Sequence, residues 1–298
     1  MKPAWSVMLL TTLIGAGQGL FLVAFFVDVF RSPPGNFVLL CGCVTLLLLG
    51  LGLIASFFHL GRPERAWRAV TQWRTSWLSR EVIVLPAFMG FVFLYAVTGS
   101  IPAGAIAAVL CVALFVCTGM IYACLPFLQE WRSPLTLINF FLLGTASGLT
   151  LSVPLAVLAY PQFAGPLSLA AFCLAAVAWL ARCASLIRNR RLRPKSTMAS
   201  AIGVKHPRIA QKAQGFMGGS YNTREFFHGR PDLVVRAVCW SFLVLVFPAP
   251  AWLLVWGGGS LDAFIAAFAL QFAGLLAERW YFFAEARHPQ NIYYQSMA

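Results

Sequence analysis

The chain has 298 residues, of which 60% are hydrophobic and only 10% are charged, and its formal net charge is +13. About a quarter of the residues of a water-soluble domain are charged, so this composition excludes a soluble enzyme and a disordered chain. An apolar excess of this size is typical of a helical protein that crosses a membrane several times. We therefore predict an all-α, polytopic membrane protein.

Uncharged apolar stretches of about 20 residues, the length that spans a bilayer, occur eight times along the chain. The predicted spans are 5–27, 37–60, 82–98, 103–125, 135–159, 164–181, 237–256 and 263–284. Together they make one membrane domain over residues 1–298, a bundle of eight transmembrane helices. Because the number of spans is even, both termini are expected on the same side.

The positions of the lysines and arginines test the number of spans. If one span were wrong, basic residues would be assigned to both sides of the membrane. With eight spans, all of them except Arg31 fall on the side of the N-terminus. Cytoplasmic connections carry an excess of Lys and Arg, so we expect both termini to be cytoplasmic. The positive charge then reflects membrane orientation and the docking of partners, and not the binding of nucleic acid.

One connection, residues 182–236, is long enough to form a substantial element outside the membrane. It begins with a basic cluster and continues through a glycine-containing stretch from Gly215 to Gly229. Aromatic residues among charges favour the core of a protein interface, and this stretch holds Phe216, Tyr221, Phe226 and Phe227. We predict a basic cytoplasmic loop that docks a soluble partner; a solvated loop on anionic lipid headgroups is the alternative.

Small residues one helical turn apart let two membrane helices approach closely. Such pairs occur in the first predicted span, Gly15 with Gly19, and in the fifth, Gly144 with Gly148. We expect these two spans to pack tightly inside the bundle.

The sequence contains no clear pattern of metal-binding residues. Its eight cysteines form no C-x-x-C pair, so we interpret them as small apolar residues and predict no metal site. Of the four histidines only His59 lies at a predicted span, whereas a membrane-embedded b-type haem generally needs two facing histidines. We therefore expect neither haem nor an iron–sulfur cluster in this chain.

Ionisable residues at membrane depth are functional candidates by default, and two stand out. His59 ends the second predicted span, and Glu81 lies at the opening of the third. The connection between them is rich in arginine and tryptophan. For either residue alone a simple explanation exists, because His59 can be a wet helix end and Glu81 can pair with Arg80 or Arg62.

Together, His59 and Glu81 suit the reduction of a quinone. That reaction builds negative charge on the carbonyl oxygens and consumes protons, so its site needs a hydrogen-bond donor, positive charge and a proton-delivering group. His59, an arginine of the connection and Glu81 meet these needs. Their position at the membrane surface also suits a molecule whose head group meets the interface while its tail lies in lipid.

The residues around this pair resemble the membrane-anchor subunit family of dimethyl sulfoxide reductase. The matching motifs are His59-Leu60-Gly61-x-Pro63-x-Arg65-Ala66 and Leu78-Ser79-x-Glu81. The resemblance implies that His59 binds the head group of a ubiquinone or menaquinone and that Glu81 relays protons. It completes a candidate quinone site of His59, Arg62, Arg65, Ser79 and Glu81, in which Arg65 matches the motif and Arg62 does not.

The resemblance further implies an anchor in the bacterial inner membrane for two partners, an iron–sulfur subunit and a molybdopterin catalytic subunit. Because the basic loops place the quinone motif inside, we expect these partners on the cytoplasmic face. In this respect the protein is similar to the anchor of the cytoplasm-facing sulfite dehydrogenases of sulfur-oxidising bacteria, in which electrons pass from sulfite to quinone.

Three other functions remain open from the sequence. One is the anchor of a quinol-oxidising terminal reductase for dimethyl sulfoxide, polysulfide or tetrathionate. Another is a transporter, which predicts inverted repeats and broken helices with ionisable groups at mid-bilayer. The third is a purely structural tether without a quinone site.

Overall fold

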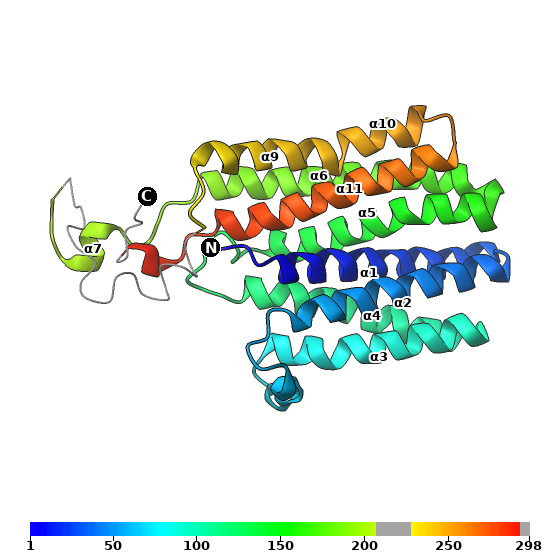
Figure 1. The fold of residues 1–298 in the computed structure, drawn as a ribbon, viewed down its shortest axis with the longest axis horizontal. Coiled ribbons are helices and arrows are strands. Elements are labelled where there is room, and N and C mark those ends of the chain that lie inside the picture. Colours follow the sequence, from blue (N-terminus) through cyan, green and yellow to red (C-terminus); the bar gives the residue numbers. More distant parts are fainter. Residues whose placement is uncertain (207–227, 293–298) are drawn as a thin grey trace.

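The structure is a computed structural model that describes residues 1–206 and 228–292. Its long helices lie side by side along one axis and alternate in direction (Figure 1). The α-helices are α1 (Trp5–Arg31), α2 (Gly35–Phe57), α3 (Trp77–Thr98), α4 (Ile101–Ala123), α5 (Pro134–Ala159), α6 (Ala164–Arg190), α7 (Met198–Ile202), α9 (Asp232–Val246), α10 (Pro248–Trp256) and α11 (Leu261–Glu285). Three short 3₁₀ segments are η1 (Pro63–Gln72), η2 (Pro161–Phe163) and η3 (Pro289–Ile292).

The described residues contain 8 helical segments that are long and apolar enough to cross a membrane. Six of them are single α-helices. The sixth in chain order joins η2 to α6, and the seventh, Asp232–Trp256, consists of α9 followed by α10. The predicted number of spans and the all-helical bundle are thereby confirmed.

The protein begins and α11 ends at the same end of the bundle. The amino group of Met1 donates hydrogen bonds to the carbonyl oxygens of Phe283 and Ala286, at 3.0 and 2.9 Å. The η1 segment and the connection from α4 to α5 lie at this end too (Figure 1). We call it the basic end, because the arginine-rich connections are located there.

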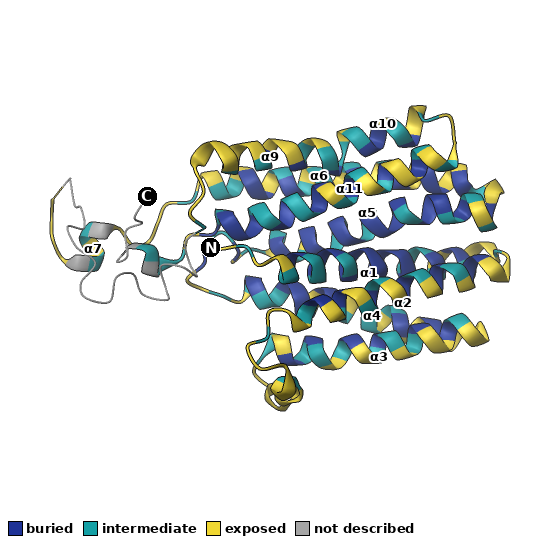
Figure 2. Ribbon diagram, viewed as in Figure 1, coloured by how far each residue is buried: buried dark blue, intermediate teal, exposed yellow. Residues whose placement is uncertain are grey.

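Helices α1 and α5 form the centre of the bundle, and about half of the residues of each are buried (Figure 2). The predicted glycine pairs lie where these two helices meet. A Cβ atom on Gly19 would overlap the backbone of Gly144, and one on Gly148 would overlap the backbone of Gly19 and Leu20. The prediction that these two spans pack tightly is confirmed. The pair of α1 and α5 lies between two groups of helices: α2, α3 and α4 on one side, and α6, α9, α10 and α11 on the other (Figure 1).

The long predicted loop, residues 182–236, is shorter than expected at both ends. Helix α6 continues to Arg190, and α9 already begins at Asp232. The prediction ended the span at Arg182 because a charge is costly in lipid, but Arg182 is 3% exposed and paired within the protein. The aromatic residues of the predicted docking surface fall in residues 207–227, outside the described residues.

The seventh span is broken between α9 and α10. Pro248 has no N–H group and cannot continue a helix without freeing carbonyl oxygens upstream. Side chains of neighbouring helices bind two such oxygens, because Trp179 Nε1 donates to Leu243 O at 2.9 Å and Gln271 Nε2 donates to Val246 O at 3.2 Å. A broken helix with ionisable groups beside it is a feature expected of transporters, but residues 242–252 contain no ionisable side chain.

Candidate functional site

The start of α3 places Glu81 inside the bundle. Ser76 is the N-cap residue, and its side chain accepts a hydrogen bond from the backbone N–H of Ser79 at 3.3 Å. The helix therefore starts before the predicted first residue of the span, residue 82, and Glu81 is part of it. From here the buried residues recur three or four positions apart, as one face of a helix requires; they are Glu81, Leu85, Phe88, Val92 and Tyr95.

The Glu81 carboxyl group has a neutral partner. Its Oε1 accepts a hydrogen bond from Thr118 Oγ1 of α4 at 2.6 Å, and the residue is only 8% exposed. The adjacent Arg80 turns away, because its guanidinium donates to the carbonyl oxygens of Trp73 and Arg74. Within the described residues no arginine or lysine pairs with Glu81, so the simple salt-bridge explanation is wrong.

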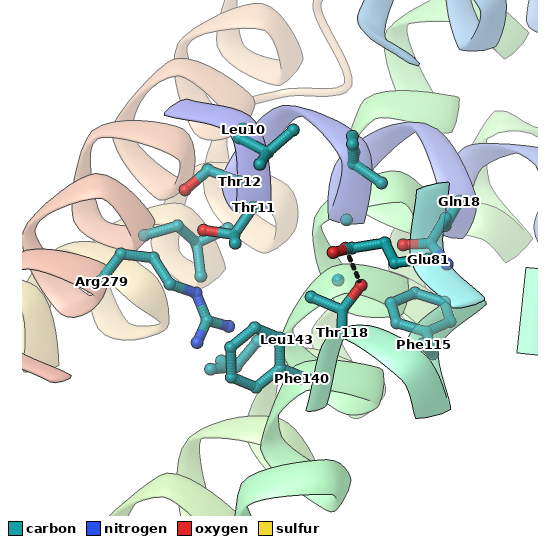
Figure 3. Close-up of a pocket in the computed structure, with 14 residues that line it drawn as sticks. Leu10, Thr11, Thr12, Gln18, Glu81, Phe115, Thr118, Phe140, Leu143 and Arg279 are labelled. Carbon is teal, nitrogen blue, oxygen red and sulfur yellow. Dashed lines mark hydrogen bonds between the residues drawn. The ribbon is translucent and has the colours of Figure 1, made fainter. Parts of the chain in front are cut away.

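Glu81 borders a small cavity in the basic half of the bundle (Figure 3). The cavity offers about 20 Å³ to water-sized occupants, which is room for about one water molecule. Arg279 of α11 enters it from the side opposite Glu81 (Figure 3). Helices α1, α4 and α5 complete the walls with Leu10, Thr11, Thr12, Ile14, Gly15, Gln18, Phe115, Thr118, Phe140, Leu143 and Gly144, and Leu275 of α11 also takes part.

A cluster of buried charges lies next to this cavity, between α6 and α11. Arg182 Nε lies 2.6 Å from Glu278 Oε1, and Arg279 Nε lies 3.5 Å from Glu278 Oε2. The second contact of Arg182 is with Glu285, 3.9 Å away. The Arg279 guanidinium also stacks over the ring of Phe140, 3.8 Å from its centroid. Two arginines and two glutamates thus neutralise one another within the protein.

His59 lies apart from this interior. It follows the last turn of α2, is exposed, and does not line the cavity that Glu81 lines. Neighbouring atoms desolvate its ring in part and lower its pKa below the ordinary value. A neutral imidazole, with one N–H donor and one acceptor, is thereby favoured at neutral pH.

The other three predicted site residues are also outside the cavity. Arg62 and Arg65 are exposed, and Arg65 makes a long contact of 3.9 Å with its neighbour Glu64. Ser79 is buried in the first turn of α3 without lining the cavity. Of the five candidates, only Glu81 borders the buried polar cavity, while His59, Arg62 and Arg65 form an exposed group on the connection from α2 to α3.

A quinone ring is larger than one water molecule, so the cavity does not accommodate the head group in this conformation. His59 itself is exposed, as are its chain neighbours Phe57 and Phe58 at the end of α2 and Leu78 at the start of α3. A separate groove of about 280 Å³ between α4 and α5 is lined only by apolar side chains. The groove is apolar, and the hydrogen-bonding candidates His59, Arg62 and Arg65 lie outside it.

Sequence reasoning missed most of the residues around Glu81. Thr118 and Thr12 gave no signal, because threonine is common in membrane helices and nothing local relates either residue to α3. Glu278 and Arg279 did give one: two adjacent ionisable residues lie inside the predicted span 263–284. Such residues in a span are functional or structural candidates by default. In the sequence, Arg279 counts as a charge of the basic side, and the family resemblance includes it together with Phe282, but neither makes it a site residue.

Two known proteins are similar to this one, the first of them from end to end. It is a subunit of the sulfite dehydrogenase of Allochromatium vinosum, 49% identical over 330 aligned residues that cover 100% of both proteins. The second is a subunit of the anaerobic dimethyl sulfoxide reductase of Haemophilus influenzae. It is 31% identical over 123 residues, which cover 38% of the present protein and 44% of the relative.

The model of one protein family also matches the sequence. It is described as "DMSO reductase anchor subunit (DmsC)", and the match covers residues 1–217. This range includes both motifs around His59 and Glu81 and six of the eight spans. With its apolar helices, the chain is a polytopic membrane protein and belongs to the family of DMSO reductase anchor subunits.

Proposed function

We propose that this chain is the membrane-anchor and quinone-reactive subunit of a sulfite dehydrogenase. The full-length similarity to a subunit of the sulfite dehydrogenase of Allochromatium vinosum supports the choice of complex. The partners would be an iron–sulfur subunit and a molybdopterin catalytic subunit. Electrons from sulfite would pass through the partner's clusters to quinone at the basic end of this bundle.

The distribution of charge supports a cytoplasmic position for these partners. The connections of the basic end carry most of the arginines, and cytoplasmic loops are enriched in Lys and Arg. Arg182 and Arg279 are buried and so do not count as charges of the connections. The difference in positive charge between the two ends is nevertheless unchanged, because Arg31 is still the only basic residue that the structure describes at the other end. The protein would then lie in the inner membrane of a bacterium with both termini inside.

The residues at the corner between α2 and α3 would have different roles in quinone reduction. A bound quinone would supply an acceptor for two electrons and two protons. The neutral His59 imidazole can donate a hydrogen bond to a ring oxygen at the lipid-facing surface, where Arg62 and Arg65 add positive charge. Glu81 can hold a proton within the bundle and release it toward the ring, while the Thr118 hydroxyl fixes the carboxyl group in place.

The observation that carries this proposal is the buried Glu81 carboxyl group without a cationic partner among the described residues. Burying a carboxyl group that is not paired with a charge is unfavourable, so a protein gains nothing in stability from placing one there. Such a group can change its protonation without breaking an ion pair. It also lies at the end of the bundle where the soluble partners would dock.

The test is to substitute His59 and Glu81 with Ala, one at a time, in the intact membrane complex. Transfer of electrons from sulfite to quinone should be lost in both variants, while reduction of a soluble dye by sulfite should be unchanged. Glu64→Ala is the matched control, because Glu64 is an exposed carboxylate of the same connection. Unchanged quinone reduction in both test variants would remove the site assignment.

The proposed geometry also determines whether the reaction generates a membrane potential. Electrons and protons would both be taken from the basic side, so the reaction alone should not charge the membrane. Vesicles that contain this complex as their single redox enzyme should therefore show quinone reduction without a membrane potential. A potential that builds up with sulfite oxidation would contradict the arrangement.

A second candidate is a complex of the same architecture that oxidises quinol and reduces a sulfoxide, polysulfide or tetrathionate. The partial similarity to a subunit of an anaerobic dimethyl sulfoxide reductase favours keeping it. The direction of electron flow depends on the potentials of the partners' centres. Assay of the purified complex with sulfite and with each oxidised acceptor distinguishes the two functions.

A further inference from the structure

We propose that a file of water molecules connects the basic end of the protein with Glu81 through two adjoining polar cavities, and that protons for the quinone reaction travel along it. The role in proton transfer rests on the proposed function. The presence of the water is independent of it and can be tested separately.

The second cavity lies between α5, α6 and α11, beside the buried charge cluster. It offers about 10 Å³ to water-sized occupants, close to the smallest space that holds one water. Its outer rim includes Glu130 and Asn189, which are partly exposed at the basic end, whereas Arg182 and Glu278 line its buried part. The cavity thus extends from the aqueous end of the bundle into its interior.

The two cavities share two wall residues, Phe140 and Arg279. Glu81 and Thr118 line the inner cavity, and Glu278 lines the outer one. The side chains of Phe140 and Arg279 therefore belong to the walls of both cavities, and a shift of these side chains would bring a water in one cavity nearer to a water in the other. Arg279 itself has N–H donors that can bind water on both sides.

Several buried polar atoms at these cavities have no hydrogen-bond partner among the described residues. Thr12 Oγ1 is one of them in the inner cavity, and Asn139 Oδ1 is another in the outer cavity. Glu278 Oε2, also at the outer cavity, has its 3.5 Å ion-pair contact with Arg279 but no hydrogen bond. Leaving a buried polar atom unpaired is costly, and buried water commonly satisfies such atoms. Thr12 is 4% exposed, Asn139 5% and Glu278 1%, so bulk solvent does not provide the missing bonds.

The charges along this path do not form a barrier to protons. A lone buried arginine would repel a positive charge, as in water channels that exclude protons. Here Arg182 and Arg279 are balanced by Glu278 and Glu285 at the distances given above. The cluster is close to neutral as a whole, and its oxygen atoms can accept hydrogen bonds from the waters.

The proton balance follows directly. Each quinone that accepts two electrons from the partner's clusters binds two protons at its oxygen atoms. For each proton that Glu81 releases, one proton from water at the basic end replaces it along the file of waters. The charge cluster keeps its own protonation throughout and acts by holding the waters in position.

The water is tested by radiolytic labelling of the intact complex in water enriched in oxygen-18. Both Phe140 and Phe37 are buried, at 5% and 0% exposed, and both belong to hydrophobic clusters, but only Phe140 borders the two cavities. Phe140 should take up the label severalfold faster than Phe37. Equal, slow labelling of the two rings would show dry cavities and overturn the inference while leaving the proposed function untouched.

Two variants test the link to proton transfer. Asn139→Leu removes an unpaired oxygen from the outer cavity, and Thr12→Val removes one from the inner cavity at nearly constant volume. Both should lower the labelling of Phe140, slow quinone reduction severalfold and increase its solvent deuterium isotope effect, with dye reduction by sulfite unchanged.

The matched control is Thr150→Val, because the Thr150 hydroxyl is buried and bonded within its own helix to Ala146 O, away from both cavities. It should change neither the labelling nor the isotope effect. Reduced labelling in the two test variants with an unchanged rate and isotope effect would overturn the role in proton transfer. Failure of the Glu81→Ala test, in contrast, would overturn the proposed function itself.

Discussion

Two buried carboxylates at the basic end of this bundle have opposite surroundings. Glu278 on α11 lies between Arg182 and Arg279, and its charge is compensated on both sides. Glu81 on α3 has one neutral partner, the Thr118 hydroxyl. The two surroundings differ in kind: Glu278 is an ion-paired carboxylate between α6 and α11, whereas Glu81 has no cationic partner among the described residues and is, in the proposed function, the group that gains and loses a proton.

Removing the paired carboxylate should have the largest effect on stability. Glu278→Gln leaves Arg279 without its ion-pair partner and Arg182 with only the long contact to Glu285, and breaking a buried ion pair in this way costs about 3–5 kcal/mol. The free energy of unfolding should fall by this amount, which thermal unfolding of the purified complex can measure. Glu64→Gln, at an exposed position, is the control. Equal stability of both variants would show that the α6–α11 cluster does not hold the bundle together.

The unpaired carboxylate should show the reverse pattern. In Glu81→Gln the amide oxygen can still accept the hydrogen bond from Thr118, so the free energy of unfolding should change by less than about 1 kcal/mol. Quinone reduction should fall at least about 100-fold, since general acid–base groups contribute that much or more. Stopped-flow reduction of quinone and thermal unfolding of the same sample provide both numbers. A stable variant with full activity would remove Glu81 from the proton path.

A smaller effect is expected from the partner of Glu81. Thr118→Val removes the hydroxyl group and leaves the carboxyl oxygen without its bond, which costs about 1–3 kcal/mol of stability for a buried polar group. Quinone reduction should decrease, but less than in Glu81→Gln, because the carboxyl group is still present. The control is Thr145→Val, whose hydroxyl bonds to Phe141 O in its own helix. A variant as inactive as Glu81→Gln would mean that the hydroxyl itself transfers the proton.

The smallest effect should come from the exposed arginines of the connection. Arg65→Ala should change the free energy of unfolding by no more than about 0.5 kcal/mol, as is usual for surface substitutions. If Arg65 attracts the head group electrostatically, the KM for quinone should rise modestly and the difference from the unsubstituted complex should shrink at high salt. A KM that is unchanged at low salt would exclude Arg65 from the site.

The number of helices could be predicted from the sequence because length and hydropathy alone determine a membrane span. The motif around His59 and Glu81 was visible too, because charged residues beside apolar spans are rare. The inward direction of Glu81 was not predicted, since a span starting near residue 82 places Glu81 at its first turn, at the membrane interface. The N-cap Ser76, together with the spacing of Glu81, Leu85 and Phe88, carried the missing information.

The charge cluster could not be predicted in its full form. Arg182 and Glu278 are far apart in the sequence, and no local pattern pairs a residue at the end of one span with a residue inside another. Their contact exists only because α6 and α11 both pack in the same half of the bundle around α5. Close approach of α1 and α5, in contrast, was predictable because glycine spacing is a local property of each helix.

The most direct test of the central claim is a structure of the intact complex with quinone bound. We expect the quinone ring at the basic end, at the corner between α2 and α3, with one ring oxygen within hydrogen-bond distance of the His59 imidazole and the Glu81 carboxyl group on the same side. The iron–sulfur subunit should lie against this end. A ring bound at the opposite end, near the hydrogen bond between Tyr95 and Asp28, or a partner subunit docked there, would contradict the account.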